Sequence, residues 1–120
     1  MIVCQCGNKI ERLVVIALEP YSTTNRQSRP LVITDGLYFA CQDCATNIVH
    51  SWEEHNKGRT EEYLIRSIDI NVSADTKKEF EKRVLPQIIG QFKNIPPRPW
   101  YIPKGDIRNA LKRVKKVKTG

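Results

Sequence analysis

Four cysteines are the residues of this sequence whose type and spacing most directly indicate a chemistry. They form two close pairs, Cys4 with Cys6 in CQCG and Cys41 with Cys44 in CQDC. Thiolates one or two residues apart can reach one ion from a single tight turn, and structural zinc takes four such ligands at about 2.3 Å. Gly7 suits the first turn because it has no Cβ and accepts a positive φ. The pattern predicts one structural Zn²⁺ bound by all four cysteines.

The same cysteines admit other interpretations. The first residues, MIVCQC, lack the charged region and apolar run of a secretory signal, so we expect a reducing, cytoplasmic location in which disulfides are rare. A redox pair at Cys41 and Cys44 would leave Cys4 and Cys6 without a role. Unpaired core thiols are the remaining alternative. The spacing favours zinc, because a four-ligand site uses every cysteine in the chain.

Two histidines raise the alternative of a metal-dependent nuclease. His50 and His55 lie close to Glu53, Glu54 and Asn56 in the sequence after the second cysteine pair. Five residues of helix separate the two histidines by about 140° net, so they cannot hold one ion together from a straight helix. The chain shows no nucleotide-binding loop and no Ser-His-Asp arrangement, and four thiolates would close the coordination sphere of zinc. We therefore expect no catalytic residues.

The elements that position the cysteines follow from the apolar pattern. Residues 10–18 (IERLVVIAL) are rich in β-branched and aliphatic side chains and predict a buried strand that ends at Pro20. The polar residues 21–30 predict a loop. Residues 44–57 carry apolar side chains at helical spacing and predict a helix that Gly58 ends.

A β-hairpin is predicted between that loop and that helix. Residues 31–34 and 37–40 are two short strand-like runs, and Asp35-Gly36 between them is typical of a tight turn. The second run leads directly into the second cysteine pair. The hairpin therefore places that pair at the start of the helix.

This order of features resembles the ligand arrangement of treble-clef zinc domains over residues 1–57. A helix N-terminus also favours the negative charge of two thiolates. The one-residue spacing of the first pair and the 34 residues between Cys6 and Cys41 leave a zinc-ribbon arrangement open. HNH nucleases place a metal on a similar frame, and His55-Asn56 is similar to part of their pattern. No histidine, however, stands before the predicted hairpin to act as a base.

The second half of the chain predicts one more strand and one more helix. Residues 62–72 alternate apolar and polar side chains, which is typical of a half-exposed strand. Ser73 and Asp75 are candidates for the N-cap of the helix that follows. Pro86 is expected to kink or divide this helix, and Gly90 to end it. Its apolar face is formed by Phe80, Val84 and Ile88.

A proline-rich segment, IPPRPWYIP, follows over residues 95–103. Its four prolines predict an extended conformation with much polyproline II character. If the segment is displayed, Trp100 and Tyr101 beside Arg98 could stack on unpaired bases. If it is structural, the two aromatic rings anchor it on the core, which is the commoner use of large aromatic side chains.

Positive charge is concentrated at the C-terminus. Residues 104–120 carry seven basic side chains and one acidic one, so they hold +6 of the net charge of +7. The basic residues are Lys104, Arg108, Lys112, Arg113, Lys115, Lys116 and Lys118. An apolar stripe accompanies them, formed by Ile107, Ala110, Leu111, Val114 and Val117. The segment therefore predicts a basic amphipathic helix over residues 106–118 that turns cations toward the phosphates of RNA or DNA. A frayed, solvated end and a helix that docks in a partner's groove are the alternatives.

The sequence thus predicts a small α+β protein in three parts. These are a zinc-organised domain (residues 1–94), the proline-rich segment (residues 95–103) and the basic tail (residues 104–120). No apolar run reaches the 18 residues of a membrane span, so we expect no membrane partner. We expect a zinc-binding accessory protein that contacts RNA or DNA, within a transcription, translation or other nucleic-acid-processing complex. The alternative is a protein-interaction module or a small inhibitor of a larger enzyme, with the C-terminal helix as its docking element.

Overall fold

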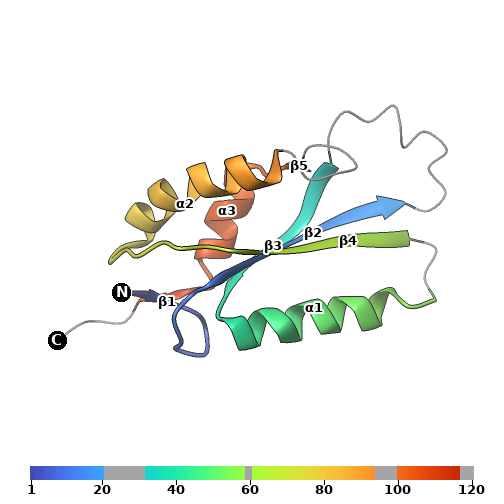
Figure 1. The fold of residues 1–120 in the computed structure, drawn as a ribbon, viewed down its shortest axis with the longest axis horizontal. Coiled ribbons are helices and arrows are strands. Elements are labelled where there is room, and N and C mark those ends of the chain that lie inside the picture. The colour runs from blue at the N-terminus through green and yellow to red at the C-terminus, as the bar shows by residue number, and fades with distance from the viewer. Residues whose placement is uncertain (21–31, 59–60, 94–99, 117–120) are drawn as a thin grey trace.

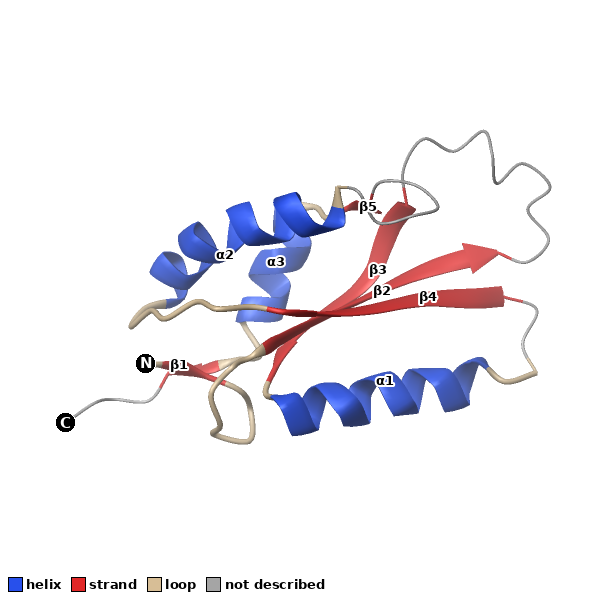
Figure 2. Cartoon of the chain, in the orientation of Figure 1, coloured by secondary structure: helices blue, strands red, loops and turns tan. Residues whose placement is uncertain are grey.

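A β-sheet covered by helices on both faces is the frame of this protein (Figures 1 and 2). The computed structural model describes residues 1–20, 32–58, 61–93 and 100–116. The elements run in the order β1 (Ile2–Val3), β2 (Arg12–Pro20), β3 (Val32–Ala40), α1 (Gln42–Asn56), β4 (Glu61–Asp69), α2 (Lys77–Phe92), β5 (Trp100–Tyr101), α3 (Lys104–Leu111) and β6 (Lys115–Lys116). This is the α+β architecture that the sequence predicts. None of the described helices combines the length and the apolarity needed to cross a bilayer.

The main sheet has the strand order β4-β2-β3-β5. Strand β2 pairs antiparallel with β3 and with β4, and the short β5 adds to β3 in parallel. Helix α1 lies on one face, where Trp52 packs edge-on against Tyr63 of β4 at a centroid distance of 4.8 Å. Helices α2 and α3 lie on the other face, where Phe80 of α2 packs against Phe39 of β3 at 5.1 Å. A second, two-stranded sheet is formed by β1 and β6.

Strand β2 is the centre of the core. Its residues 13–17 are five consecutive apolar side chains, each 0% exposed. Successive side chains of a strand point to opposite faces, so such a run is buried only where both faces of the sheet are covered. The prediction of a buried strand over residues 10–18 is confirmed, and the helices on both faces explain why the run does not alternate.

Strand β3 corrects the predicted hairpin. Residues 31–34 and 37–40 do not form two strands around a turn, because β3 runs without a break from Val32 to Ala40. Ile16 pairs with Gly36 and Ala17 with Thr34, so Asp35 is an extra residue opposite β2. This is a β-bulge, a place where glycine is common in strands. The Asp-Gly signal therefore marks an irregularity in a long strand, and the segment that joins β2 to β3 falls in residues 21–31, outside the described residues.

Helix α1 agrees closely with its prediction. It covers Gln42–Asn56, against the predicted range 44–57, and Gly58 follows it with φ at +74°. A positive φ costs glycine little, because it has no Cβ. Ala45 on its inner face is buried. Only Cys41 separates the end of β3 from the start of α1, so the second cysteine pair lies at the junction of the two elements.

Helix α2 begins and ends later than predicted. Its N-cap is Thr76, not Ser73 or Asp75, and the Thr76 hydroxyl accepts a hydrogen bond from the Glu79 backbone N–H at 3.1 Å. The helix continues through Pro86 and ends at Phe92, beyond Gly90. Its predicted apolar face is confirmed, since Phe80, Val84, Ile88 and Phe92 are all buried. Burial of this face favours a helix that continues despite the hydrogen bond that proline cannot make.

The C-terminal segment belongs to the core and is not a separate tail. Helix α3 covers only Lys104–Leu111, and β6 then pairs antiparallel with β1, Val3 opposite Lys115. The helix predicted over residues 106–118 is therefore too long, and Val117 lies outside the described residues. The apolar stripe is confirmed up to its fourth member, because the following side chains are buried: Ile107, Ala110, Leu111 and Val114. Both ends of the described chain meet in the small sheet (Figure 1).

The end of the proline-rich segment is also part of the core. Trp100 is only 5% exposed, and its ring lies 5.6 Å from that of Phe92. This confirms the anchoring interpretation for Trp100, which is therefore not free to stack on a base. Tyr101 is 52% exposed. The rest of the segment up to residue 99, with Arg98, lies outside the described residues.

Candidate metal centre

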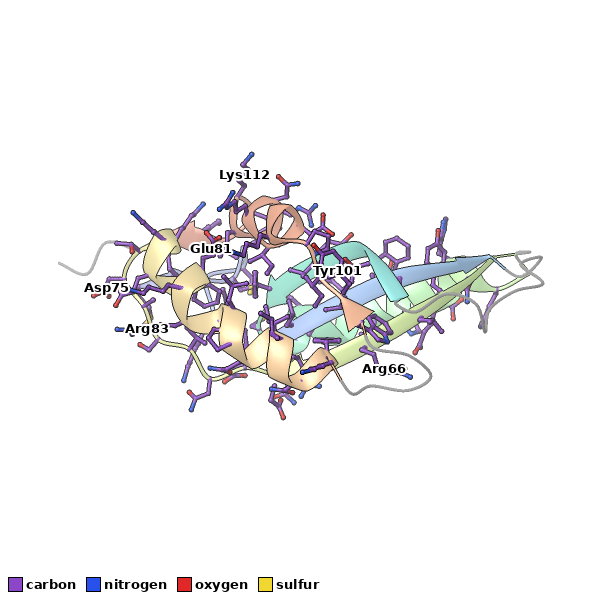
Figure 3. All side chains as sticks on the ribbon, turned by 90° about the horizontal axis from the view of Figure 1, so that it is seen from above. Arg66, Asp75, Glu81, Arg83, Tyr101 and Lys112 are labelled. Carbon is purple, nitrogen blue, oxygen red and sulfur yellow. The ribbon has the colours of Figure 1, made fainter. Side chains whose placement is uncertain are left out.

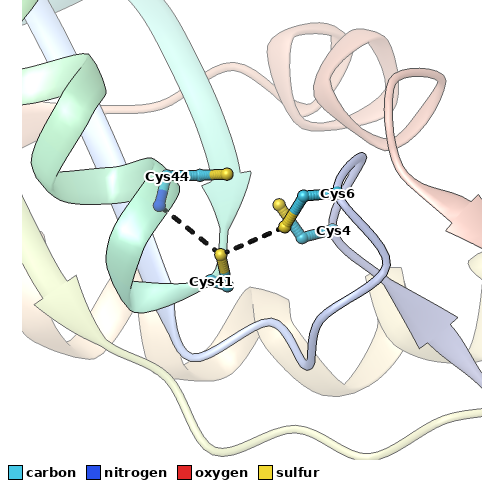
Figure 4. A group of neighbouring side chains, drawn as sticks. All are labelled: Cys4, Cys6, Cys41 and Cys44. Atoms are coloured by element: carbon cyan, nitrogen blue, oxygen red, sulfur yellow. Dashed lines mark hydrogen bonds between the residues drawn. The ribbon is translucent and has the colours of Figure 1, made fainter.

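The first cysteine pair is presented by a tight turn that follows β1. The Gly7 backbone N–H donates to the Cys4 carbonyl at 2.8 Å, and the Cys4 N–H donates to the Asn8 carbonyl at the same distance. Gly7 has φ at +92°, as the sequence predicts for this position. The two hydrogen bonds close the turn and direct both thiols of the pair toward the start of α1 (Figure 4).

The second pair lies where β3 meets α1. Cys41 is the N-cap of α1, and its sulfur accepts a hydrogen bond from the Cys44 backbone N–H at 3.4 Å. Cys44 lies in the first helical turn. The unpaired N–H groups and the dipole of a helix N-terminus favour negative charge there, which would help to hold thiolates once a metal has displaced their protons.

The tertiary structure brings the two pairs together. All four sulfur atoms lie within 4.8 Å of one another, and Cys6 Sγ lies 3.4 Å from Cys41 Sγ (Figure 4). Four thiolates around one zinc at 2.3 Å would stand about 3.8 Å apart, so the cluster is close to the required size. Cys4 and Cys41 are buried, Cys44 is half-buried and Cys6 is exposed. The predicted ligand set is confirmed as one cluster that could hold a metal ion.

Neighbouring groups polarise the cluster. The Asn8 side-chain amide donates to Cys6 Sγ at 3.3 Å and reaches Cys41 Sγ at 3.9 Å, as outer hydrogen-bond donors do around metal-bound thiolates. The pKa of Cys44 is raised well above its usual value by hydrogen bonds to Cys6, Cys41 and Cys4, with a smaller contribution from burial. The thiol form of Cys44 is therefore favoured over the thiolate in the metal-free cluster, and a metal that binds there must displace a proton.

The cluster also borders the C-terminal segment. A cavity of about 230 Å³ lies between them, and its walls include Cys4, Cys44, Tyr38 and Arg113. The Arg113 guanidinium lies 5.0 Å from the centre of the Tyr38 ring and donates to the Leu37 carbonyl at 3.3 Å. A metal at this point would therefore connect the N-terminal turn and the β3-α1 junction next to the end of α3.

The two histidines stand apart from this cluster. His50 is exposed on α1 and lines a cavity of about 410 Å³ together with Arg12, Glu53 and Ser67. His55 lies five residues further along α1, with its ring 6.1 Å from that of Trp52. Within the described residues, the four cysteines are the one group of three or more side chains that could hold a metal ion.

The predicted nucleic-acid residues are only partly assembled into a surface. Lys104, Arg108, Lys112, Arg113 and Lys115 are all exposed. The two arginines also have contacts within the protein. Arg108 Nε lies 3.3 Å from Glu81 Oε1, and the Arg113 guanidinium lies over the Tyr38 ring of β3. Lys116 lies in β6, and Lys118 lies outside the described residues.

Helix α2 adds cations that sequence reasoning missed. It carries four basic and two acidic residues in its first seven positions and lies beside α3 (Figures 1 and 3). The basic residues are Lys77, Lys78, Lys82 and Arg83. Helix α1, on the opposite face of the sheet, carries three acidic residues and no lysine or arginine. The sheet therefore separates a positive layer from a negative one. The missed signal was the basic start of α2, which becomes informative only when α2 and α3 are known to be neighbours.

Comparison with models of protein families, with curated proteins and with solved structures gives no match to this chain, so its own geometry must carry the functional argument.

Proposed function

We propose that this chain is a zinc-binding accessory protein that contacts the backbone of RNA or DNA. The four-cysteine cluster supports one structural zinc, because the ligands are all sulfur, their number is four, and they would complete a tetrahedral site. A closed site leaves no position for a substrate, so the proposal includes no catalytic role. When bound, the zinc would supply a cross-link between distant segments.

The proposed zinc site is of the treble-clef type. A cysteine turn is followed by the antiparallel pair β2-β3 and then by α1, whose first turn carries the second cysteine pair. In a zinc ribbon we would expect the second pair on the turn of a hairpin, and here it enters a helix. The pairing of β2 with β3 supplies the hairpin that the sequence placed, wrongly, around Asp35-Gly36.

The observation that carries the nucleic-acid proposal is the positive layer formed by α2, α3 and the residues after α3. Sequence-independent binding rests on cations that replace the counterions of phosphates. A face with cations from two adjacent helices can contact several phosphates at once. The negative α1 layer would repel phosphates, so the nucleic acid would approach the positive face of the protein. Nothing in this layer is built to read base edges, so binding without sequence preference is expected.

Neutralising the positive layer is expected to weaken binding to any sequence. The triple variant Lys104→Gln, Lys112→Gln and Lys115→Gln removes three exposed cations and lowers the net charge from +7 to +4. Each lost phosphate contact reduces the slope of log K against log salt by about 0.9 on duplex DNA, so the slope should fall by up to about 2.7. Fluorescence anisotropy with generic single- and double-stranded RNA and DNA across a salt series measures this.

The matched control places the same charge change on the opposite layer. Thr46→Glu, Asn47→Glu and Ser51→Glu lie at exposed positions of α1 and also bring the net charge to +4. This control should bind nearly as well as the unmodified chain. Equal losses in both triple variants would mean that only net charge matters, and no binding by the unmodified chain would favour the protein-interaction alternative.

A further inference from the structure

A second candidate site lies on the positive side of the sheet, far along α2 from the helix start. A cavity of about 650 Å³ opens between the C-terminal half of α2, β5 and α3. Ile88, Phe92 and Ile107 are fully buried in its walls, whereas Ile89 and Tyr101 are 61% and 52% exposed. Small-molecule sites in proteins have volumes of about 300–1,000 Å³ and mostly apolar walls. The cavity therefore has the size and the lining of a ligand site.

One polar atom in this apolar lining has no hydrogen-bond partner among the described residues. The Trp100 indole Nε1 is buried and makes no hydrogen bond to any described residue, although Trp100 lines the cavity. Buried indole N–H groups usually find an acceptor, since an unpaired one is costly. A ligand that brings an oxygen atom into the cavity would supply that acceptor.

The charged residues among the described lining of the cavity are all basic. Lys93 and Lys104 are exposed members of its lining, and none of its described lining residues is acidic. An anionic group would therefore be attracted to the cavity, whereas a cationic group would be repelled. Apolar walls combined with two cations and one free N–H donor match an apolar chain that ends in a carboxylate.

We propose that this cavity binds a monomeric carboxylate amphiphile of the fatty-acid type. The alkyl chain lies against the walls formed by α2 and α3, and the carboxylate lies near Lys93 and Lys104 within reach of the indole N–H. This site is separate from the cysteine cluster and does not depend on nucleic-acid binding.

Two-dimensional ¹H–¹⁵N NMR of the full-length chain tests the proposal with decanoate as the probe. The chain has two tryptophans, and Trp52 packs on the opposite face of the sheet, so its indole signal is an internal control. The Trp100 indole N–H should shift on titration while that of Trp52 stays in place. Decanol and decyltrimethylammonium, which have the same chain length, should bind at least about fivefold more weakly. Equal shifts with all three probes, or shifts at Trp52 alone, would overturn the proposal.

Variants separate chain binding from headgroup binding. Ile89→Glu puts a negative charge at an exposed position of the lining and should weaken decanoate binding about tenfold or more. Lys93→Gln with Lys104→Gln should remove the preference for decanoate over decanol. The matched control, Lys78→Gln with Lys82→Gln, removes two exposed cations of α2 outside the lining and should preserve that preference. Decanoate binding unchanged by Ile89→Glu would show that this cavity is not the site.

Nucleic-acid binding provides an independent readout. Ile89→Glu should retain most of the binding to generic RNA or DNA, because this variant leaves every proposed phosphate-binding cation in place. Loss of decanoate binding with retained nucleic-acid binding supports a separate ligand site. Failure of the nucleic-acid proposal would leave the decanoate titration unaffected.

Discussion

Replacing Cys41 with serine is expected to abolish stoichiometric zinc binding and to unfold the chain. Cys41 has several structural roles in addition to its place in the cluster. It is 4% exposed, it caps α1, and its sulfur lies 3.4 Å from that of Cys6. A serine hydroxyl can still cap the helix, so the expected loss reports on the metal and not on the cap.

The expected effect is large because the free energy of zinc binding is as large as the free energy of unfolding of a small domain. Structural zinc contributes about 10–16 kcal/mol of apparent binding free energy at neutral pH. The net unfolding free energy of a small domain is about 5–15 kcal/mol. Losing the metal would therefore remove most or all of the stability, and a chelator should have the same effect on the unmodified chain.

Elemental analysis and circular dichroism measure the two parts of this prediction. One zinc per chain is expected in the unmodified protein and none in Cys41→Ser, with loss of the cooperative thermal transition. Asn8→Ala is the matched control, since it removes a hydrogen-bond donor to the sulfurs but no ligand, and it should keep the zinc with a lower melting temperature. A metal-free unmodified chain whose fold survives a chelator would contradict the zinc proposal.

Deleting residues 104–120 is expected to unfold the chain as well. The deletion removes α3 and β6, and with them a set of buried side chains, Ile107, Ala110, Leu111 and Val114. Burial of the three larger side chains alone contributes about 5–9 kcal/mol, at about 1.5–3 kcal/mol each. Strand β1 would lose its pairing with β6 and keep its contacts with Ala74 and Lys9, so the turn that carries the first cysteine pair would be held less firmly.

Thermal melts followed by circular dichroism measure this effect. The Lys104, Lys112 and Lys115 triple glutamine variant is the control, because it removes charge from the same segment without changing a buried side chain. It should melt within a few degrees of the unmodified chain, since exposed substitutions usually cost little. A truncated chain with an unchanged cooperative melt would show that the segment is a dispensable tail. Because the truncated chain is expected to unfold, truncation cannot serve as the test of nucleic-acid binding.

Local patterns predicted several elements correctly. The apolar run over residues 10–18 forms the central strand, and the helical spacing after Cys44 forms α1 with Gly58 directly after it. Each depends on a periodicity or on a backbone conformation that the residues themselves determine. The same holds for Gly7, whose positive φ the turn requires.

Predictions failed where a local signal had two meanings. Asp35-Gly36 is typical of a tight turn, but opposite a long partner strand it forms a bulge, and only the pairing with β2 decides between the two. The basic amphipathic pattern after Lys104 indicates a helix, yet the chain leaves the helix at Leu111 because β1 offers an edge for β6. For Trp100 the sequence favoured anchoring over display, and the Phe92 ring that packs beside it agrees with that preference.

The sequence by itself determined the candidate ligands, since the number, type and spacing of the cysteines indicate a four-thiolate site without any fold. It also determined the excess of positive charge near the C-terminus. Only the tertiary structure decided that the two cysteine pairs meet and that α2 joins α3 in one positive layer opposite the acidic α1. It alone also revealed the apolar cavity between α2, β5 and α3. The reason is physical. Spacing fixes which side chains share a turn or a helix face, but contacts between distant segments depend on how the sheet orders its strands and on which face each helix covers.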